Sequence, residues 1–201
     1  MVALVVQNAR PRQRVGGLQQ WPILAVTRAF VRGFGRRRPD ACVTVLRLAN
    51  MVGPRVDTGL TRYLSLPVVP TVLGFDPRVQ LCHEDDGIEV LMRTTLEDHP
   101  GIFNVGGDGV LPLSQAVRRA GRVGVPIPGP AVSLVGSLFR SAGLVDFSPE
   151  QMRFLSHGRV VDTTRIKREL GWEPKYPDIE SIIRTAWAWH SQHPKGYGRR
   201  P

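Results

Sequence analysis

The feature that most constrains this 201-residue sequence is a near-continuous apolar run at residues 42–48, Cys-Val-Thr-Val-Leu-Arg-Leu. Such a run predicts a strand that is buried on both faces, as in a parallel sheet. The stretch before it carries apolar residues at helical spacing, namely Ile23, Val26, Phe30 and Phe34. This spacing predicts an amphipathic helix over 22–37, and Pro39 helps to end it. A helix followed by a buried strand is half of a βαβ unit, so the sequence indicates an α/β fold.

The alternation of strand-like and helix-like stretches continues along the chain. Further strands are expected at 68–74, 79–86 and 101–105, and further helices at 87–98 and from Ser114, as N-cap, to about Arg122. Residues 50–61 are polar and turn-rich and are expected to form a loop. Gly106, Gly107 and Gly109 are expected to form an ordinary turn after the strand at 101–105.

Composition divides the chain into four parts. Residues 1–21 are rich in Arg, Gln and Gly and show no sustained period, so they are expected to be irregular. Residues 22–123 contain the sheet-forming region, and residues 124–194 are expected to form a mostly helical C-terminal subdomain. Its first residues, 124–130, read Gly-Val-Pro-Ile-Pro-Gly-Pro and predict a linker. Residues 195–201 are expected to be a disordered tail.

The C-terminal subdomain shows several helix signals. Helices are expected at 131–141, from a capping-box start at Ser148, from Asp162 as N-cap to Gly171 as stop, and from Asp178 as N-cap. With the alternation upstream, these signals favour a sheet followed by a helical subdomain.

The net charge of +10 lies at the two ends of the chain. Residues 1–40 hold eight Arg and one Asp, residues 195–201 hold three basic residues, and residues 41–194 hold 16 basic and 16 acidic residues. A nucleic-acid-binding domain carries its basic residues on the folded face, so this distribution argues against a nucleic-acid partner.

Cysteine content and hydropathy indicate the compartment. Cys42 and Cys82 lie in strand-like runs without a Cys-x-x-Cys spacing or a His cluster, which predicts two buried free thiols. No apolar run reaches the roughly 20 residues of a membrane span. The N-terminus lacks the basic residues that precede the apolar core of a signal peptide. A cytoplasmic protein without membrane association is therefore expected.

One cluster, His83-Glu84-Asp85-Asp86, offers metal-ligating side chains at the end of a predicted strand. Alternate strand residues point to opposite faces, so only some of the four could converge on an ion. Asp85 or Asp86 is instead expected to cap the following helix, and no metal site is predicted. Trp172, Trp187 and Trp189 are expected to be packing residues.

Four short motifs in a fixed order resemble a known family. They are Arg47/Asn50/Gly53/Pro54, His83/Asp86, Asn104/Gly106/Gly107 and Leu170/Gly171/Trp172/Pro174. In this order and at this spacing they resemble the C-terminal half of an extended short-chain dehydrogenase/reductase, the NAD-dependent epimerase/dehydratase group. The resemblance covers about residues 28–190. It implies a partial Rossmann-like parallel sheet, made of the C-terminal strands only, with a mostly helical substrate-side subdomain.

The resemblance also shows which functional parts are missing from the sequence. Such enzymes hold NAD(P) at a Gly-rich turn after their first strand and transfer a proton with a Tyr-x-x-x-Lys pair on the helix before the strand at 42–48. No such Gly-rich turn precedes that strand, and Tyr63, Tyr176 and Tyr197 all lack a Lys four residues later. No catalytic and no cofactor-binding residue is therefore assigned. The chain is expected to be a truncated or degenerate family member that does not bind NAD(P) tightly.

Two residues are implied by resemblance to bind substrate. Asn50 follows the strand at 42–48, where its amide would contact a sugar nucleotide; alternatively it bonds its own turn. Arg78 would hold phosphate, since guanidinium groups match phosphate oxygens. Many family members place that Arg seven residues before the Asp of the second motif, where this chain has Val79. A shift of one residue turns a strand side chain to the other face, so a solvated Arg78 is the alternative.

The function expected from the sequence is that of the C-terminal portion of an epimerase/dehydratase-like protein. It would act on a sugar nucleotide or a related hydroxyl substrate and be inactive alone. The alternatives are a non-catalytic nucleotide- or protein-binding module and a basic nucleic-acid-binding protein. A second copy or a partner protein is expected to cover the sheet edge that the missing strands would leave exposed.

Overall fold

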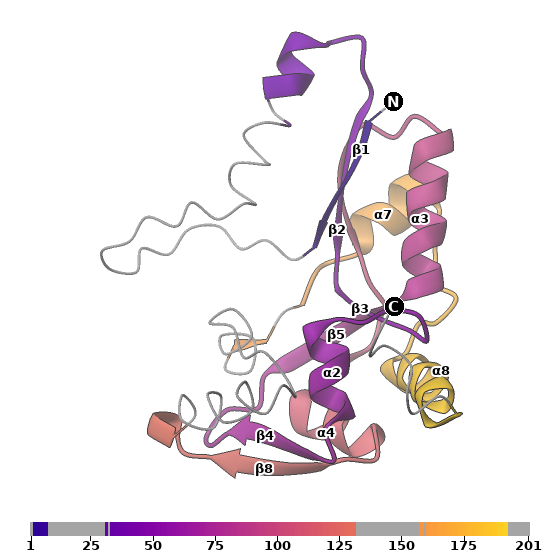
Figure 1. The fold of residues 1–201 in the computed structure, drawn as a ribbon. Helices are drawn as coiled ribbons and strands as arrows, with labels where there is room; N and C mark the ends of the chain where they lie inside the picture. The colour runs from indigo at the N-terminus through magenta and orange to yellow at the C-terminus, as the bar shows by residue number, and fades with distance from the viewer. Residues whose placement is uncertain (1, 8–30, 32, 132–156, 159, 193–201) are drawn as a thin grey trace, which may run out of the picture.

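The structure of the chain, a computed structural model, describes residues 2–7, 31, 33–131, 157–158 and 160–192. In chain order the elements are β1 (Val2–Gln7), β2 (Val43–Leu48), β3 (Asn50–Val52), α2 (Gly59–Ser65), β4 (Val68–Val72), β5 (Arg78–His83), α3 (Glu84–Leu96), β6 (Gly101–Val105), β7 (Val110–Pro112), α4 (Leu113–Arg119), β8 (Val123–Ile127), α7 (Thr164–Leu170) and α8 (Ile179–Gln192). The fold is therefore α/β, as predicted (Figure 1).

The strands of the described residues form three small sheets. β2 lies between β1 and β6 and is parallel to both; β3 is parallel to β5, which pairs antiparallel with β7; and β4 is parallel to β8. The predicted strands at 42–48, 68–74 and 101–105 correspond to β2, β4 and β6. The predicted parallel arrangement is confirmed, with the β5–β7 pair as the exception.

Two apolar cores hold the sheets and helices together. One side of the β1–β2–β6 sheet packs against α3 and α7, with Leu46, Phe103, Val90, Ile166 and Trp172 in its core. The second core joins β4 and β5 to α2, α4 and α8. Trp172 is 1% exposed, as expected for a packing residue. The side chains of Trp187 and Trp189 lie outside the described residues.

β2 differs from its prediction in burial. Its residues alternate between half-buried and buried, with Thr44, Leu46 and Leu48 facing the core. The expectation of burial on both faces is wrong for the described part of the chain, because α3 and α7 pack on one side only. Cys82 is a buried free cysteine as predicted, whereas Cys42 is a half-buried one.

Two segments expected to lack regular structure form strands. Within the irregular segment predicted at 1–21, residues 2–7 form β1, since Val-Ala-Leu-Val-Val pairs along its length with β2. The predicted linker at 124–130 lies largely in β8, which pairs with β4. Pro126 is tolerated there because a strand at the edge of its sheet needs no donor on the outer side. Residues 8–21, 132–156 and 195–201, with the predictions made on them, lie outside the described residues.

Helix ends show a similar mixture of outcomes. Gly171 ends α7 in the left-handed conformation, with φ of 58°, and the Asp178 carboxylate accepts a hydrogen bond from the Ser181 backbone N–H at 2.7 Å, both as predicted. The N-cap position of α7 is Thr163, one residue after the predicted Asp162. Ser114 lies inside α4 and does not cap it; its backbone N–H and hydroxyl donate to Asp76 instead.

The turn-rich loop expected at 50–61 is shorter than predicted. Its first residues form β3, and α2 begins at Gly59 after a capping box made by Thr58 and Thr61. The described part of the predicted helix at 22–37 is helical at residue 31 and at 33–37. The described residues include no helix with the length and hydropathy of a membrane span.

Candidate functional site

Asn50 lies where the chain changes its strand partner. Leu48, at the end of β2, pairs with Val105 of β6, whereas Asn50, at the start of β3, pairs with Leu81 of β5. Ala49 between them donates its backbone N–H to the Val105 carbonyl at 2.7 Å. In open α/β sheets, ligands bind at the carboxyl ends of strands where neighbouring strands diverge. The structure therefore places Asn50 at the kind of position that was predicted for it.

The Asn50 side chain has an unused donor. Its Nδ2 is buried, and no described residue accepts a hydrogen bond from it. A buried donor without an acceptor costs about 1–3 kcal/mol, and such groups in native proteins call for an explanation. Nδ2 therefore makes no hydrogen bond of the kind expected if Asn50 only bonded its own turn.

Arg78 lies on the other face of β5. Asn50 shares a face with its partner Leu81, and strand side chains alternate, so Val79 also lies on that face while Arg78 lies opposite. The two cores agree with this alternation, because Val79 and Leu81 belong to one and Cys82 to the other. The structure does not bring Arg78 to the side of Asn50.

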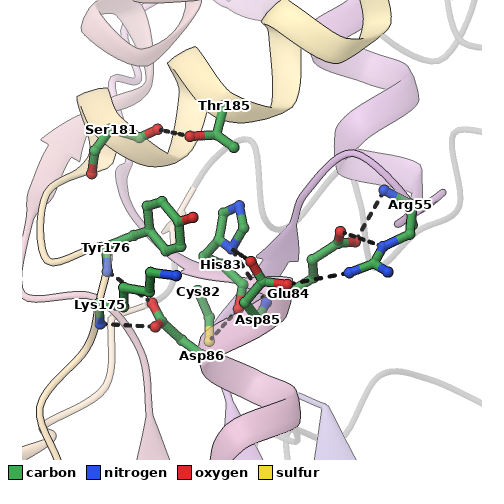
Figure 2. Close-up of polar contacts among 10 residues, drawn as sticks. All are labelled: Arg55, Cys82, His83, Glu84, Asp85, Asp86, Lys175, Tyr176, Ser181 and Thr185. Atoms are coloured by element: carbon green, nitrogen blue, oxygen red, sulfur yellow. Dashed lines mark hydrogen bonds and ion pairs between the residues drawn. The ribbon is translucent and has the colours of Figure 1, made fainter.

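His83 fills the position that was predicted for an acid. It is the N-cap of α3, and its Nδ1 accepts a hydrogen bond from the Asp85 backbone N–H at 3.2 Å (Figure 2). The ring is 1% exposed and lies 3.8 Å, between centroids, from the Tyr176 ring. Burial lowers the pKa of His83, against the opposing effect of the acids nearby. The prediction of Asp85 or Asp86 as the helix cap is wrong, because the imidazole already occupies that position.

Asp86 holds the segment that leads into α8. Its two carboxylate oxygens accept hydrogen bonds from the backbone N–H groups of Lys175 and Tyr176, at 2.8 and 3.2 Å (Figure 2). Burial raises the pKa of Asp86, and the two amide bonds oppose that shift. Burial, and secondarily Asp86, raises the pKa of the Cys82 thiol to about 12, so this thiol is not a nucleophile near neutral pH.

Glu84 holds the loop that follows β3. It is 2% exposed and accepts hydrogen bonds from the backbone N–H and the Nε of Arg55, at 3.0 and 3.1 Å. A Cβ at Gly53 would lie 2.5 Å from Glu84 Cδ, so a side chain at position 53 would displace this carboxylate. The acids of the His83–Asp86 cluster therefore fix loops to the sheet. No group of three metal-ligating residues occurs among the described residues.

The remaining motifs also serve packing. A Cβ at Gly107 would lie 3.1 Å from the backbone oxygens of Leu81 and Pro177, so this glycine allows the turn after β6 to lie against β5 and the segment before α8. The prediction of a strand-to-loop turn is confirmed. Gln80, which the sequence did not single out, joins the same elements: its amide donates to the Gly107 carbonyl and accepts from the Val161 N–H, both at 2.7 Å.

Comparison with known proteins places this geometry among epimerases and dehydratases. No family model matches the chain. An uncharacterised protein of Mycobacterium tuberculosis (strain H37Rv) is 52% identical over 153 residues, which are 76% of this chain and 41% of that protein. A probable UDP-arabinose 4-epimerase of rice is 43% identical over an alignment of 201 residues, covering 84% of this chain and 45% of that protein. The chain thus spans less than half the length of these relatives.

A solved structure matches more of the chain. The dTDP-glucose 4,6-dehydratase of Bacillus anthracis, solved in complex with NAD, superposes with a TM-score of 0.60 at 14% identity, covering 94% of this chain and 58% of that one. The chain has the fold of part of an NAD-dependent epimerase or dehydratase. Together with the sequence similarity to the rice epimerase, this fold confirms the predicted resemblance to the epimerase/dehydratase group.

Proposed function

We propose that the chain is the substrate-side portion of an epimerase/dehydratase-like protein of the cytoplasm, and that it binds a sugar nucleotide without transferring hydride by itself. The fold shared with the dTDP-glucose dehydratase and the sequence similarity to a UDP-arabinose epimerase support the substrate class. In an intact family member NAD(P) would accept the hydride; we expect this chain not to bind it tightly.

The observation that carries the proposal is the unused Asn50 donor. Sugar hydroxyls and pyrophosphate oxygens are hydrogen-bond acceptors, and either could satisfy Nδ2 at the point where β2 leaves β6. Arg78 lies on the opposite face of β5, so we assign the contact with the ligand to Asn50 and do not include Arg78 in the proposed site.

The described tyrosines support the proposed lack of hydride transfer by this chain alone. A tyrosine that carries a proton in catalysis needs a lowered pKa, which an adjacent Lys supplies in this family. The Tyr63 hydroxyl instead donates to the Pro70 carbonyl at 2.6 Å, and burial raises its pKa. Tyr176 packs against His83. The Lys175 Nζ lies 5.6 Å from the Tyr176 ring centroid, but neither tyrosine has the Lys four residues later that the family's pair requires.

Calorimetric titration with UDP-glucose tests the proposal. We expect the chain to bind and an Asn50→Leu variant, which keeps the size but loses the donor, to bind about tenfold more weakly. An Asn50→Asp variant, with an acceptor in place of the donor, is expected to bind no better than Asn50→Leu. Equal binding by all three would contradict the site. Formation of NADH when NAD⁺ and UDP-glucose are added to the chain alone would contradict the absence of hydride transfer.

A second candidate function is a non-catalytic module that engages a partner protein. The observation that favours it is the side of the β1–β2–β6 sheet away from α3, where Ile102 is 39% exposed and Val43 and Val45 are only half-buried. Size-exclusion chromatography with an ANS fluorescence assay separates the candidates. A monomer without dye binding argues against this module, whereas dye binding without UDP-glucose binding favours it.

A further inference from the structure

Helix α3 has a second apolar face that points away from the core. Its inner side packs on the sheets through Asp86, Gly87, Val90 and Thr94, which are all buried. Four large apolar side chains elsewhere on the helix are exposed: Ile88 by 45%, Leu91 by 36%, Met92 by 58% and Leu96 by 78%. In Figure 1, α3 lies at the side of the molecule, with the β1–β2–β6 sheet and α7 on its inner side.

The spacing of these residues places them on one stripe. They occupy positions i, i+3, i+4 and i+8, which recur on one side of an α-helix and are the spacing of a helix–helix seam. A helix whose only partner is its own core carries polar residues at such positions. A contiguous exposed apolar stripe marks an interaction surface.

The charges beside the stripe identify its occupant. Glu89 and Arg93 lie four residues apart and flank the same side of the stripe. When two identical helices pack antiparallel, the side of the stripe that carries Glu89 and Arg93 in one copy faces the same side in the other copy. Glu89 of each copy would then meet Arg93 of the other, which gives two ion pairs. The outer acids do not oppose this arrangement, because Asp85 pairs with Arg55 and Glu97 pairs with Arg93 and His99 in their own chain. Arg93 would therefore bridge Glu97 of its own chain and Glu89 of the second copy.

We propose that α3 is a self-association surface, on which a second copy of the chain packs its own α3 antiparallel about Leu91. The apolar stripe supplies the buried area, the two Glu89–Arg93 pairs set the direction, and the opposed helix dipoles favour the same direction. A pair of 13-residue helices buries less than a standard interface, so the dimer is weak, with a Kd in the micromolar range.

Sedimentation velocity over a concentration series tests the proposal. The full chain is expected to shift reversibly from monomer to dimer. The double variant Met92→Lys/Leu96→Lys is expected to dimerise at least about tenfold more weakly, because two lysines would be buried in the seam. Leu73→Lys, at an apolar residue that is 56% exposed in the turn after β4, is the matched control and is expected to dimerise like the wild type. A wild-type monomer at every concentration, or an unaffected double variant, would overturn the proposal.

Charge reversal tests the antiparallel direction. Glu89→Arg and Arg93→Glu are each expected to weaken the homodimer, because each places like charges opposite each other. An equimolar mixture of the two variants restores both pairs in the heterodimer and is expected to associate like the wild type. The variant with both reversals restores them in the homodimer. If mixing restores nothing, α3 does not pack on itself in this way.

Discussion

The ends of two neighbouring strands use their polar residues in opposite ways. After β5, Glu84 holds Arg55 and Asp86 holds the segment before α8. His83 caps α3 through Nδ1, while its buried Nε2 has no partner among the described residues. After β2, Asn50 keeps a buried donor without an acceptor among the described residues. The difference teaches that a polar cluster can look more functional in the sequence than a residue such as Asn50, whose buried donor has no acceptor among the described residues. Four predictions test whether the two strand ends differ in this way.

The largest effect is expected at Asp86. Asp86→Ala would leave the backbone N–H groups of Lys175 and Tyr176 buried without an acceptor, and it should lower the free energy of unfolding by about 3 kcal/mol. Urea denaturation measures this loss. Asp85→Ala is the control, because its carboxylate is 41% exposed and pairs with an exposed guanidinium; a change below about 1 kcal/mol is expected there. Equal losses in both variants would contradict the role given to Asp86.

Gly53 should show the next largest effect. Gly53→Ala would place a Cβ 2.5 Å from Glu84 Cδ and displace the carboxylate that holds Arg55, at a cost of about 2 kcal/mol. Gly129→Ala, where a Cβ meets nothing within 4 Å, should change the free energy of unfolding by less than about 0.5 kcal/mol. If thermal denaturation gives the same small change for both, Glu84 does not depend on the close approach at Gly53.

The pH dependence of stability should report on His83. Burial lowers the pKa of His83 below its ordinary 6.5, so the unfolded chain binds its proton at a higher pH than the folded chain does. This contribution to stability is fully present above pH 6.5 and is lost as the pH falls below 6.5 and through the lowered pKa of the folded chain. The raised pKa of Asp86 acts in the opposite direction, but around and above its ordinary value of 3.8. His83→Asn, which keeps a cap acceptor, should flatten the loss; an unchanged slope in urea midpoints would rule out His83 as its source.

The smallest effect on folding is expected at Asn50. Because Nδ2 makes no hydrogen bond to a described residue, Asn50→Leu removes an unpaired buried donor and should not lower the free energy of unfolding, while it weakens UDP-glucose binding. A loss comparable to that of Asp86→Ala would show that Asn50 is a structural residue. The comparison of the two variants in one urea series therefore separates the two strand ends.

Local pattern predicted the parts of the fold that depend on near neighbours. The strands at 42–48 and 101–105, the Gly171 stop and the Asp178 cap follow from β-branched runs, glycine conformation and side-chain acceptors, all of which act within a few residues. β1 was missed because its short apolar run stands in a segment rich in Arg, Gln and Gly, and β8 was missed because the Pro and Gly residues of 124–130 favour a loop.

In the candidate site, too, local features could be predicted from the sequence and long-range contacts could not. The position of Asn50 after a buried strand was readable, whereas the partners of the His83–Asp86 cluster were not. Asp86 bonds to Lys175 and Tyr176, about 90 residues further along the chain. The one-residue offset of Arg78 was readable from its spacing to Asp86, and the strand register places it on the face opposite Asn50.

The central claim is that the Asn50 amide is held for a ligand. The most direct test is the ¹⁵N–¹H NMR spectrum of the side-chain amides during a titration with UDP-glucose. The Asn50 NH₂ resonances should shift with saturation, while those of Asn104, which already donates to the Asp162 carbonyl at 2.8 Å, should stay in place. Resonances of Asn50 that do not move at saturating UDP-glucose would contradict the claim.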